Sequence, residues 1–459
     1  MKYKNIYYLL VFIIFIGAGC SDDDNSPGEG NQENELKTFA LDESRNNIPV
    51  TSEGSIDGNM VEVFLPPGTD ISALVADFTL SDNAKAFIEN TEVVSGKSVI
   101  DFREVVELTV ISESGLSRVY KVGIKQDYES VDEEAEYIMN KYNIPGLQLA
   151  VTYKERLVYL KSYGIADKET NAPVTNESLF RVASVSKSVT LAAILKLIEN
   201  NKLSFDDKVF GSEGILAFDY GTPPYGQHVE SVTVKHLVEH KSGWTNYPFD
   251  PMFGYPGYNN EELLNEMLDN RSIANTPGTV ENYLNFGYFV LARVIEKITG
   301  LPYEEYVQQA ILEPCGISNM KVGKTLVTDR FEKEVVYYDQ ENYSPYLIDV
   351  ARMDAGGGWI ASAEDLTRFL VRMDRNNSKP DILSATSLNY LYLSYGTWVF
   401  NGSMSGTASS LSRINDDLGG SVVVNTRAIP DTEMLSAINN LLTVRIASIT
   451  KWPKYDLFD

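Results

Sequence analysis

The chain has 459 residues, of which 43% are hydrophobic and 22% charged, and its formal net charge is -25 at pH 7. This length accommodates two or three domains with cores of their own, and the composition is that of a globular protein. Because an acidic surface repels phosphate, nucleic acids and anionic membrane surfaces are excluded as preferred partners.

The first twenty residues have the pattern of an export signal. Lys2 and Lys4 precede the apolar run 7–16, and the small residues 17–19 precede Cys20. The apolar run is short for a membrane span. Cys20 after small residues resembles the lipobox of bacterial lipoproteins. This resemblance implies a signal peptide over residues 1–19 and a lipid anchor on Cys20, and an ordinary signal peptide is the alternative.

Residues 20–35 are rich in Asp, Asn, Gly, Ser and Glu. Such a stretch buries too little apolar surface to fold, so it is predicted to be a flexible tether. Its acidic start, residues 21–24, resembles the signal that directs lipoproteins of the Bacteroidetes to the cell surface. The resemblance implies an outer membrane lipoprotein that faces the cell surface, or alternatively the periplasm.

Residues 36–126 are predicted to form a small all-β sandwich. Short runs rich in Val, Ile, Phe and Thr are separated by turn-forming residues, as in antiparallel sandwiches. The runs cover residues 61–65, 74–80, 105–111 and 117–124. The stretch resembles the Ig-like modules that Bacteroidetes place behind lipoprotein anchors. We interpret it as a spacer, with a glycan-binding module as the alternative.

Residues 130–459 are predicted to form an α+β domain. Strand-like runs at both ends enclose a middle part with helical periodicity. This order allows the two ends to build one antiparallel sheet with helices packed on it, while the middle forms a helical subdomain. A cleft between sheet and subdomain is the expected place for a site.

The stretch 180–187 combines a serine with a lysine three positions later, Ser184 and Lys187, just before the apolar helical run 189–198. Residues three apart share a helix face, so the lysine amine can lie beside the serine hydroxyl. A hydroxyl needs a neighbouring base to attack at neutral pH. A lysine serves when burial and a helix N-terminus lower its pKa.

Two further stretches add polar groups to this pair. Tyr283 and Asn285 precede another apolar run, and a phenol held partly as phenolate near Lys187 would shuttle the serine proton, while the asparagine bonds the lysine and a substrate amide. A strand over 398–403 ends in Gly402 and Ser403. A strand edge beside Ser184 would supply one backbone N–H for an oxyanion, and Ser184 the other.

The chain carries S-x-x-K, then Y-x-N about a hundred residues later, then a glycine-containing strand about another hundred residues on. This order of motifs resembles the serine β-lactamase and penicillin-binding-protein superfamily. The chain is similar to its class C type, a group of β-lactamase-related hydrolases and esterases. The resemblance covers about residues 130–450. Further matching stretches are 179–184, 236–243, 356–366 and 424–425.

The resemblance implies a role for each motif residue. Ser184 is acylated, Lys187 and Tyr283 handle its proton, and Asn285 orients groups. The backbone N–H groups of Ser184 and Ser403 form the oxyanion hole. No cofactor and no metal are implied, and the substrate is a small molecule or a fragment of a peptide or of peptidoglycan.

One motif departs from the family pattern. Lys-Thr-Gly or His-x-Gly normally precedes the strand residue, whereas this chain has Phe400, Asn401 and Gly402. The departure removes a cation that would bind a substrate carboxylate. We expect a serine hydrolase that acts on an ester or amide through an acyl-Ser184 intermediate. An esterase is therefore favoured over a D-amino-acid peptidase or a β-lactamase-like enzyme. The alternative is a weak or inactive member of the family that binds peptide or peptidoglycan fragments.

The sequence contains two other candidate sites. His236 and His240 stand in an H-x-x-E-H pattern, which on a helix can bind zinc. The chain has only one further histidine, His228, and the same place in the resembling superfamily carries a helix end, so we predict no metal. If Cys20 is acylated, Cys315 has no disulfide partner and is expected to be a buried, inert thiol.

Overall fold

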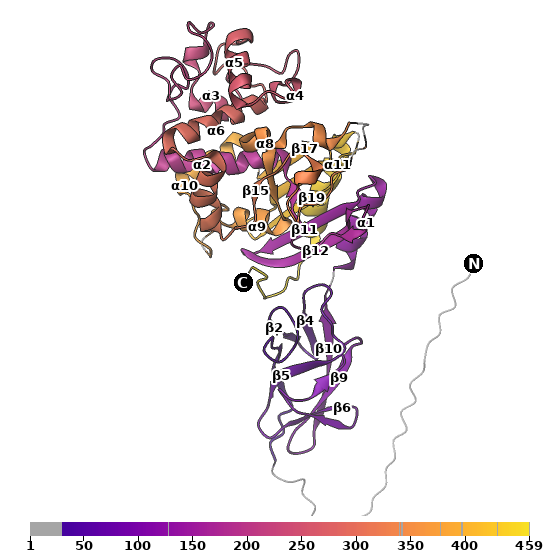
Figure 1. Cartoon of the computed structure of the whole chain (residues 1–459). Coiled ribbons are helices and arrows are strands. Elements are labelled where there is room, and N and C mark those ends of the chain that lie inside the picture. Colours follow the sequence, from indigo (N-terminus) through magenta and orange to yellow (C-terminus); the bar gives the residue numbers. More distant parts are fainter. Residues whose placement is uncertain are drawn as a thin grey trace, which may run out of the picture.

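The computed structural model describes residues 30–458 except 127, 339, 341–342, 377, 396–397 and 429. The predicted signal peptide, Cys20 and the first ten residues of the predicted tether lie outside the described residues. An all-β part comes first along the chain and an α+β part follows it (Figure 1). The fold class predicted from the sequence is confirmed.

The all-β part consists of two sheets around one core. The strand orders are β2-β1-β5-β8 and β3-β4-β10-β9-β6-β7, and all neighbours are antiparallel except β4 and β10. Phe39 contacts its cross-strand partner Phe78 and also Phe102, and all three rings belong to the core. The strands are β1 (Leu36–Leu41), β2 (Ser52–Glu53), β3 (Ser55–Asp57), β4 (Met60–Phe64), β5 (Leu74–Leu80), β6 (Lys85–Ile88), β7 (Thr91–Val93), β8 (Val99–Ile100), β9 (Val106–Ile111) and β10 (Ser117–Lys125).

The α+β part is built on a six-stranded antiparallel sheet. Its order is β13-β12-β11-β19-β18-β17, so strands from both ends of this part meet at the β11–β19 pair, as the sequence predicted. The strands are β11 (Gly146–Tyr153), β12 (Arg156–Asp167), β13 (Ala172–Pro173), β17 (Val399–Met404), β18 (Thr407–Arg413) and β19 (Leu418–Val424).

Helices cover both faces of this sheet because successive side chains of a strand point to opposite faces. Leu147, Leu149 and Val151 of β11 pack in one cluster with the helices α1 (Glu129–Lys141) and α11 (Asp431–Asn440). Ala150 belongs to the other and larger cluster, which contains α2 (Ser186–Glu199) and α9 (Ala363–Val371). The sheet is therefore a buried middle layer.

Helix α2 is buried along almost its whole length, as expected for a helix that is apolar on all sides. The helices α3 to α6 gather on one side of it (Figure 1). None of the helices in the described ranges has the length and apolar character that a membrane crossing requires. The remaining helices are α3 (Val234–Val238), α4 (Pro251–Gly254), α5 (Asn260–Asn270), α6 (Asn285–Thr299), α7 (Tyr303–Val307), α8 (Val350–Met353) and α10 (Ala385–Tyr395).

A small sheet leads the chain into α2. Its order is β14 (Phe180–Arg181), β16 (Trp359–Ala361) and β15 (Lys321–Val322). The fully buried Arg181 stacks on the ring of Tyr337 at 4.2 Å and donates to the carbonyls of Pro345 and Lys324 at 2.9 and 3.0 Å. A buried guanidinium needs such partners. This anchor lies three residues before Ser184.

Candidate active site

Ser184 lies in the short turn η1 (Ala183–Val185) directly before α2, and not within the α-helix itself. The preceding residue, Ala183, has a φ of +45°, in the left-handed region that costs a non-glycine residue energy. Val182, the residue before Ala183, is fixed to β16 because its N–H donates to Trp359 O at 3.0 Å. The strained turn directs Ser184 into a cavity.

Lys187 lies in the first turn of α2 and is fully buried. Its Nζ donates to Ser184 Oγ at 3.1 Å, to Asn285 Oδ1 at 2.7 Å and to the carbonyl of Gly356. Burial lowers the pKa of Lys187 to about 7, against the opposing effect of the negative charge of Asp250. The amine that the sequence predicted beside Ser184 is thus partly neutral at neutral pH.

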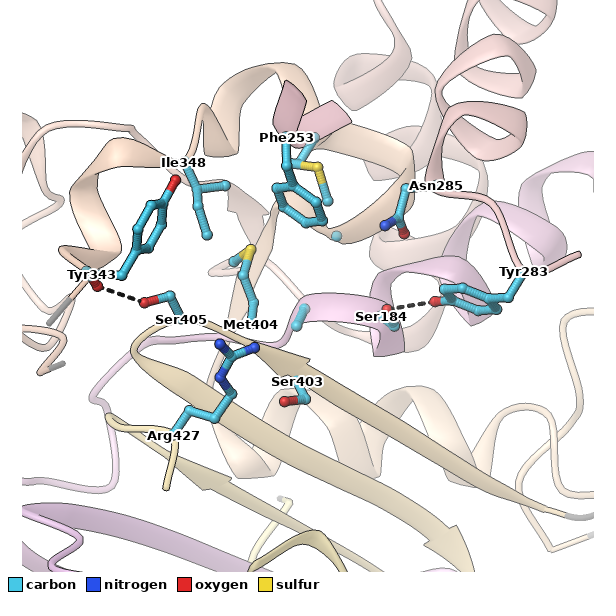
Figure 2. Close-up of a pocket in the computed structure, with 13 residues that line it drawn as sticks. Ser184, Phe253, Tyr283, Asn285, Tyr343, Ile348, Ser403, Met404, Ser405 and Arg427 are labelled. Atoms are coloured by element: carbon cyan, nitrogen blue, oxygen red, sulfur yellow. Dashed lines mark hydrogen bonds between the residues drawn. The ribbon is translucent and has the colours of Figure 1, made fainter. Parts of the chain in front are cut away.

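Tyr283 also contacts Ser184, and its ring lies 4.8 Å from Lys187 Nζ. Its hydroxyl donates to Ser184 Oγ at 2.6 Å, although 48% of the residue is exposed (Figure 2). Burial of the hydroxyl end raises the pKa of Tyr283 to about 12. The expectation of a partial phenolate is therefore wrong at neutral pH, and the tyrosine acts on Ser184 as a hydrogen-bond donor.

Asn285 is the first residue of α6. Its carbonyl oxygen accepts from Lys187, as expected, but its amide NH2 donates to Asp250 Oδ2 at 2.8 Å. An amide NH2 carries two hydrogens, and Asn285 also lines the cavity, so its expected contact with a substrate amide stays a prediction.

Strand β17 runs directly against the turn that carries Ser184. A Cβ atom added at Gly402 would lie 2.1 Å from Val182 O and 3.1 Å from Ser184 N, so only glycine allows this approach. The next residue, Ser403, lines the same cavity as Ser184 and donates through Oγ to Asp431 Oδ2 at 3.0 Å. The two residues expected to form an oxyanion hole therefore face one space.

The cavity has a volume of about 260 Å³ and differs in character between its two ends (Figure 2). Ser184 and Tyr283 lie at one end, and Arg427 extends toward the cavity beside Ser403. Phe253, Ile348, Met353 and Met404 add apolar surface to the wall, and Tyr343 and Ser405 add polar groups. The lining residues are Ala183, Ser184, Phe253, Tyr283, Asn285, Tyr343, Ile348, Met353, Gly357, Ser403, Met404, Ser405 and Arg427.

The departure at Phe400 has a structural explanation. Phe400 is 5% exposed and packs in the core, so its side chain neither offers a cation nor fills the cavity. Arg427 lies three residues after the end of β19 and brings a cation to the cavity from there. Sequence reasoning missed this arginine and Asp250, because neither belongs to a motif and only folding brings them near Ser184.

The alternative sites make other contacts. His240 Nδ1 accepts from Leu284 N at 3.2 Å, and burial lowers the pKa of His240 to about 3. His236 closes the start of α3 by accepting from Thr233 N. Within the described part of the chain, no group of three metal-ligating side chains forms. Cys315 is buried, which raises its pKa to about 12.

Comparison with known sequences agrees with this geometry. A sequence profile described as "Beta-lactamase" matches residues 131–410, more than half of the chain. The chain belongs to the beta-lactamase family. A second profile, described as "SGBP, N-terminal", matches residues 42–124, within the all-β part that precedes the beta-lactamase region.

Relatives of this beta-lactamase family member include penicillin-binding proteins. The putative penicillin-binding protein PbpX of Bacillus subtilis is 31% identical over 222 residues, which cover 46% of this chain and 51% of the relative. The octameric penicillin-binding protein homologue from Pyrococcus abyssi superimposes with a TM-score of 0.55 at 25% identity, covering 69% of this chain and 77% of that one.

A class C beta-lactamase has the same fold, with a TM-score of 0.55 at 18% identity over 70% of this chain and 96% of that one. The chain spans about half the length of the curated relatives it matches. The family and the fold of the beta-lactamase region are therefore shown.

The pKa of Lys187 sets a pH dependence for the reactivity of Ser184. Below pH 7 the amine is protonated and cannot accept the serine proton, so we expect the rate of Ser184 modification by a fluorophosphonate to rise through a midpoint near pH 7. Well below the midpoint the rate should fall about tenfold per pH unit. Intact-mass kinetics between pH 5 and 9 measure this. Lys187→Arg, which stays charged, should show no such rise with pH. An identical rise in that variant would contradict the assignment of the midpoint to Lys187.

Proposed function

We propose that this protein is a serine hydrolase that cleaves an ester or amide through an acyl-Ser184 intermediate. The observation that carries the proposal is the buried amine of Lys187, 3.1 Å from Ser184 Oγ and with a pKa lowered to about 7. At pH 7 about half of such an amine is neutral and able to accept a proton.

The geometry supports a two-step reaction. Ser184 Oγ attacks the substrate carbonyl carbon while its proton passes to Lys187, and the backbone N–H groups of Ser184 and Ser403 stabilise the oxyanion. Tyr283, hydrogen-bonded to Ser184 Oγ, relays the proton from Lys187 to the leaving alcohol or amine as the carbonyl–heteroatom bond breaks. Water then attacks the acyl-enzyme and restores Ser184 and the free acid.

Esters are the proposed preferred substrates. The motif position that normally carries a cation has Phe400, whose buried side chain offers none there, and Arg427 brings its charge from a different place, beyond the end of β19. An ester also has a better leaving group than an amide, so it places a smaller demand on proton delivery by Tyr283, whose pKa is about 12.

The cavity favours an acyl donor with an apolar body and an anionic group. Phe253, Ile348 and Met404 line it with apolar surface, and Arg427 brings a positive charge. A guanidinium carries five N–H donors, so it can keep a contact within the protein and still bind a carboxylate with two hydrogen bonds.

Labelling tests the nucleophile. Intact-mass analysis after incubation with a fluorophosphonate should show one adduct in the wild type and none in Ser184→Ala. Ser188→Ala removes a neighbouring buried hydroxyl, which donates to Val185 O, and should retain the adduct. An adduct with a fluorophosphonate but not with a penicillin would support the ester preference. No adduct with either reagent would favour a binding protein built on the same fold.

Substrate pairs test the role of Arg427. We expect Arg427→Gln to lower kcat/KM for an ester that carries a free carboxylate about tenfold more than for the same ester with that carboxylate methylated, because a charge-assisted hydrogen-bonded pair is lost. Equal losses for both members of the pair would show that Arg427 serves the structure and not substrate recognition.

A second candidate function concerns the all-β part. The "SGBP, N-terminal" match over residues 42–124 supports glycan binding by this part. We also propose a lipid anchor on Cys20, which would hold the glycan-binding part and the hydrolase at an outer membrane surface. Binding to a polysaccharide would then concentrate the hydrolase near its substrate.

Affinity electrophoresis tests the glycan proposal. In native gels containing a soluble polysaccharide, the chain should migrate more slowly than in plain gels, and removal of residues 36–125 should abolish the retardation. Retardation that persists without these residues would assign glycan binding to the hydrolase part, and no retardation in a panel of polysaccharides would leave the all-β part as a spacer.

A further inference from the structure

Asp250 is hydrogen-bonded to Asn285, which in turn bonds Lys187. It lies outside every motif of the sequence. It precedes α4, where its Oδ1 accepts from Met252 N at 2.9 Å, and its Oδ2 accepts from Asn285 Nδ2 at 2.8 Å. We infer that Asp250 is a positioning residue, which fixes the amide of Asn285 with its carbonyl toward Lys187 and places a negative charge near that lysine. The inference rests on the proposed hydrolase function.

The orientation follows from donor and acceptor chemistry. An asparagine side chain has an acceptor at one end and a donor at the other. In the observed orientation the acceptor meets the Lys187 amine at 2.7 Å and the donor meets the Asp250 carboxylate at 2.8 Å. A flipped amide would place NH2 against an amine and oxygen against a carboxylate. The contact of oxygen with the carboxylate would be repulsive, and so would that of NH2 with the protonated amine, so Asp250 selects one orientation of Asn285.

Two arginines hold the segment that carries Asp250. Arg271 and Arg352 both donate to backbone carbonyls of this segment, on either side of Asp250. These bonds stabilise a segment whose regular secondary structure is the short helix α4. Arg271 bonds the carbonyls of Thr245, Tyr247 and Phe249 at 2.6–3.2 Å, and Arg352 bonds those of Met252, Tyr255 and Tyr258 at 2.6–2.9 Å.

The same segment reaches the substrate cavity. Phe253, three residues after Asp250, lines the cavity wall. A substrate that packs on Phe253 therefore contacts the element that also positions Asn285 and, through it, Lys187. This link connects the shape of the acyl group to the placement of the base.

The charge of Asp250 opposes the effect of burial on Lys187. Burial lowers the pKa of Lys187 and the Asp250 carboxylate raises it again, so the value of about 7 is a balance. Burial in turn raises the pKa of Asp250, while its hydrogen bonds and the charges of Lys187 and Arg271 lower it.

Two tyrosine rings and one imidazole also face this pair. The rings of Tyr283 and Tyr288 lie 4.8 and 5.6 Å from Lys187 Nζ, and the pKa of Tyr283 is about 12. His240, with a pKa of about 3, is neutral. A change in the titration of Lys187 on removal of the Asp250 charge is therefore assigned to that charge.

Asp250→Asn tests the inference. The variant keeps the shape but has one acceptor atom where two are used, so either the bond to Met252 N or the bond to Asn285 is lost. We expect the titration midpoint of Lys187, followed by NMR of ¹³C-labelled lysine and assigned by its loss in Lys187→Met, to fall by about one pH unit. The rise of the fluorophosphonate labelling rate with pH should shift by the same amount. The labelling rate at high pH, where it no longer changes, should drop about tenfold or more.

Asp349→Asn is the matched control. Asp349 also precedes a four-residue helix and accepts a backbone N–H, that of Arg352 at 3.0 Å, and its other bond is to Thr325. In the Asp349→Asn variant, the titration midpoint of Lys187 should stay that of the wild type. An unshifted midpoint in Asp250→Asn, whatever the labelling rate, would overturn the inference, and so would equal shifts in both variants.

The two measurements separate this inference from the proposed function. The Lys187 titration needs neither substrate nor label. A wild-type protein that no fluorophosphonate labels would reject the hydrolase, while a lowered Lys187 midpoint in Asp250→Asn would still support the pairing of Asp250 with the buried lysine.

Discussion

The burial of one lysine amine is the constraint on which the site depends. A buried ammonium is costly unless hydrogen-bonded, and Lys187 finds acceptors on three separate elements: the turn before α2, the start of α6 and the turn η7 (Asp354–Gly358). All three must be in place together. The same burial lowers the pKa to about 7 and so makes the lysine a base. The arrangement that stabilises the amine is thus also the one that activates Ser184.

Buried polar contacts hold these three elements in register. Arg293 of α6 donates to Asp354 Oδ2 at 2.6 Å, and Thr190 of α2 donates to Ala355 O at 2.8 Å, so η7 is tied to both helices. On the other side the edge strand β17 approaches the turn so closely that Gly402 has no room for a side chain. The strained φ of Ala183 persists because the surroundings determine it from both sides.

The substrate cavity shows how a missing motif residue is replaced in space. Phe400 packs into the core, while Arg427, which follows the end of β19, reaches the cavity. Charge near a cavity depends on which strand ends meet there, and not on one position in the sequence. For this reason a cation at the cavity does not require one at position 400.

Local patterns predicted much of this protein. Short runs of apolar and β-branched residues between turn formers indicated the strands, and the three-residue spacing of Ser184 and Lys187 placed the amine beside the hydroxyl, because both depend only on neighbouring residues. The tertiary structure decided the rest. Asp250 and Arg427 join the site from distant segments, and Tyr283 remains a phenol because its pKa depends on burial. Burial and long-range contact are properties of the folded chain, and they decided the charge states on which the chemistry rests.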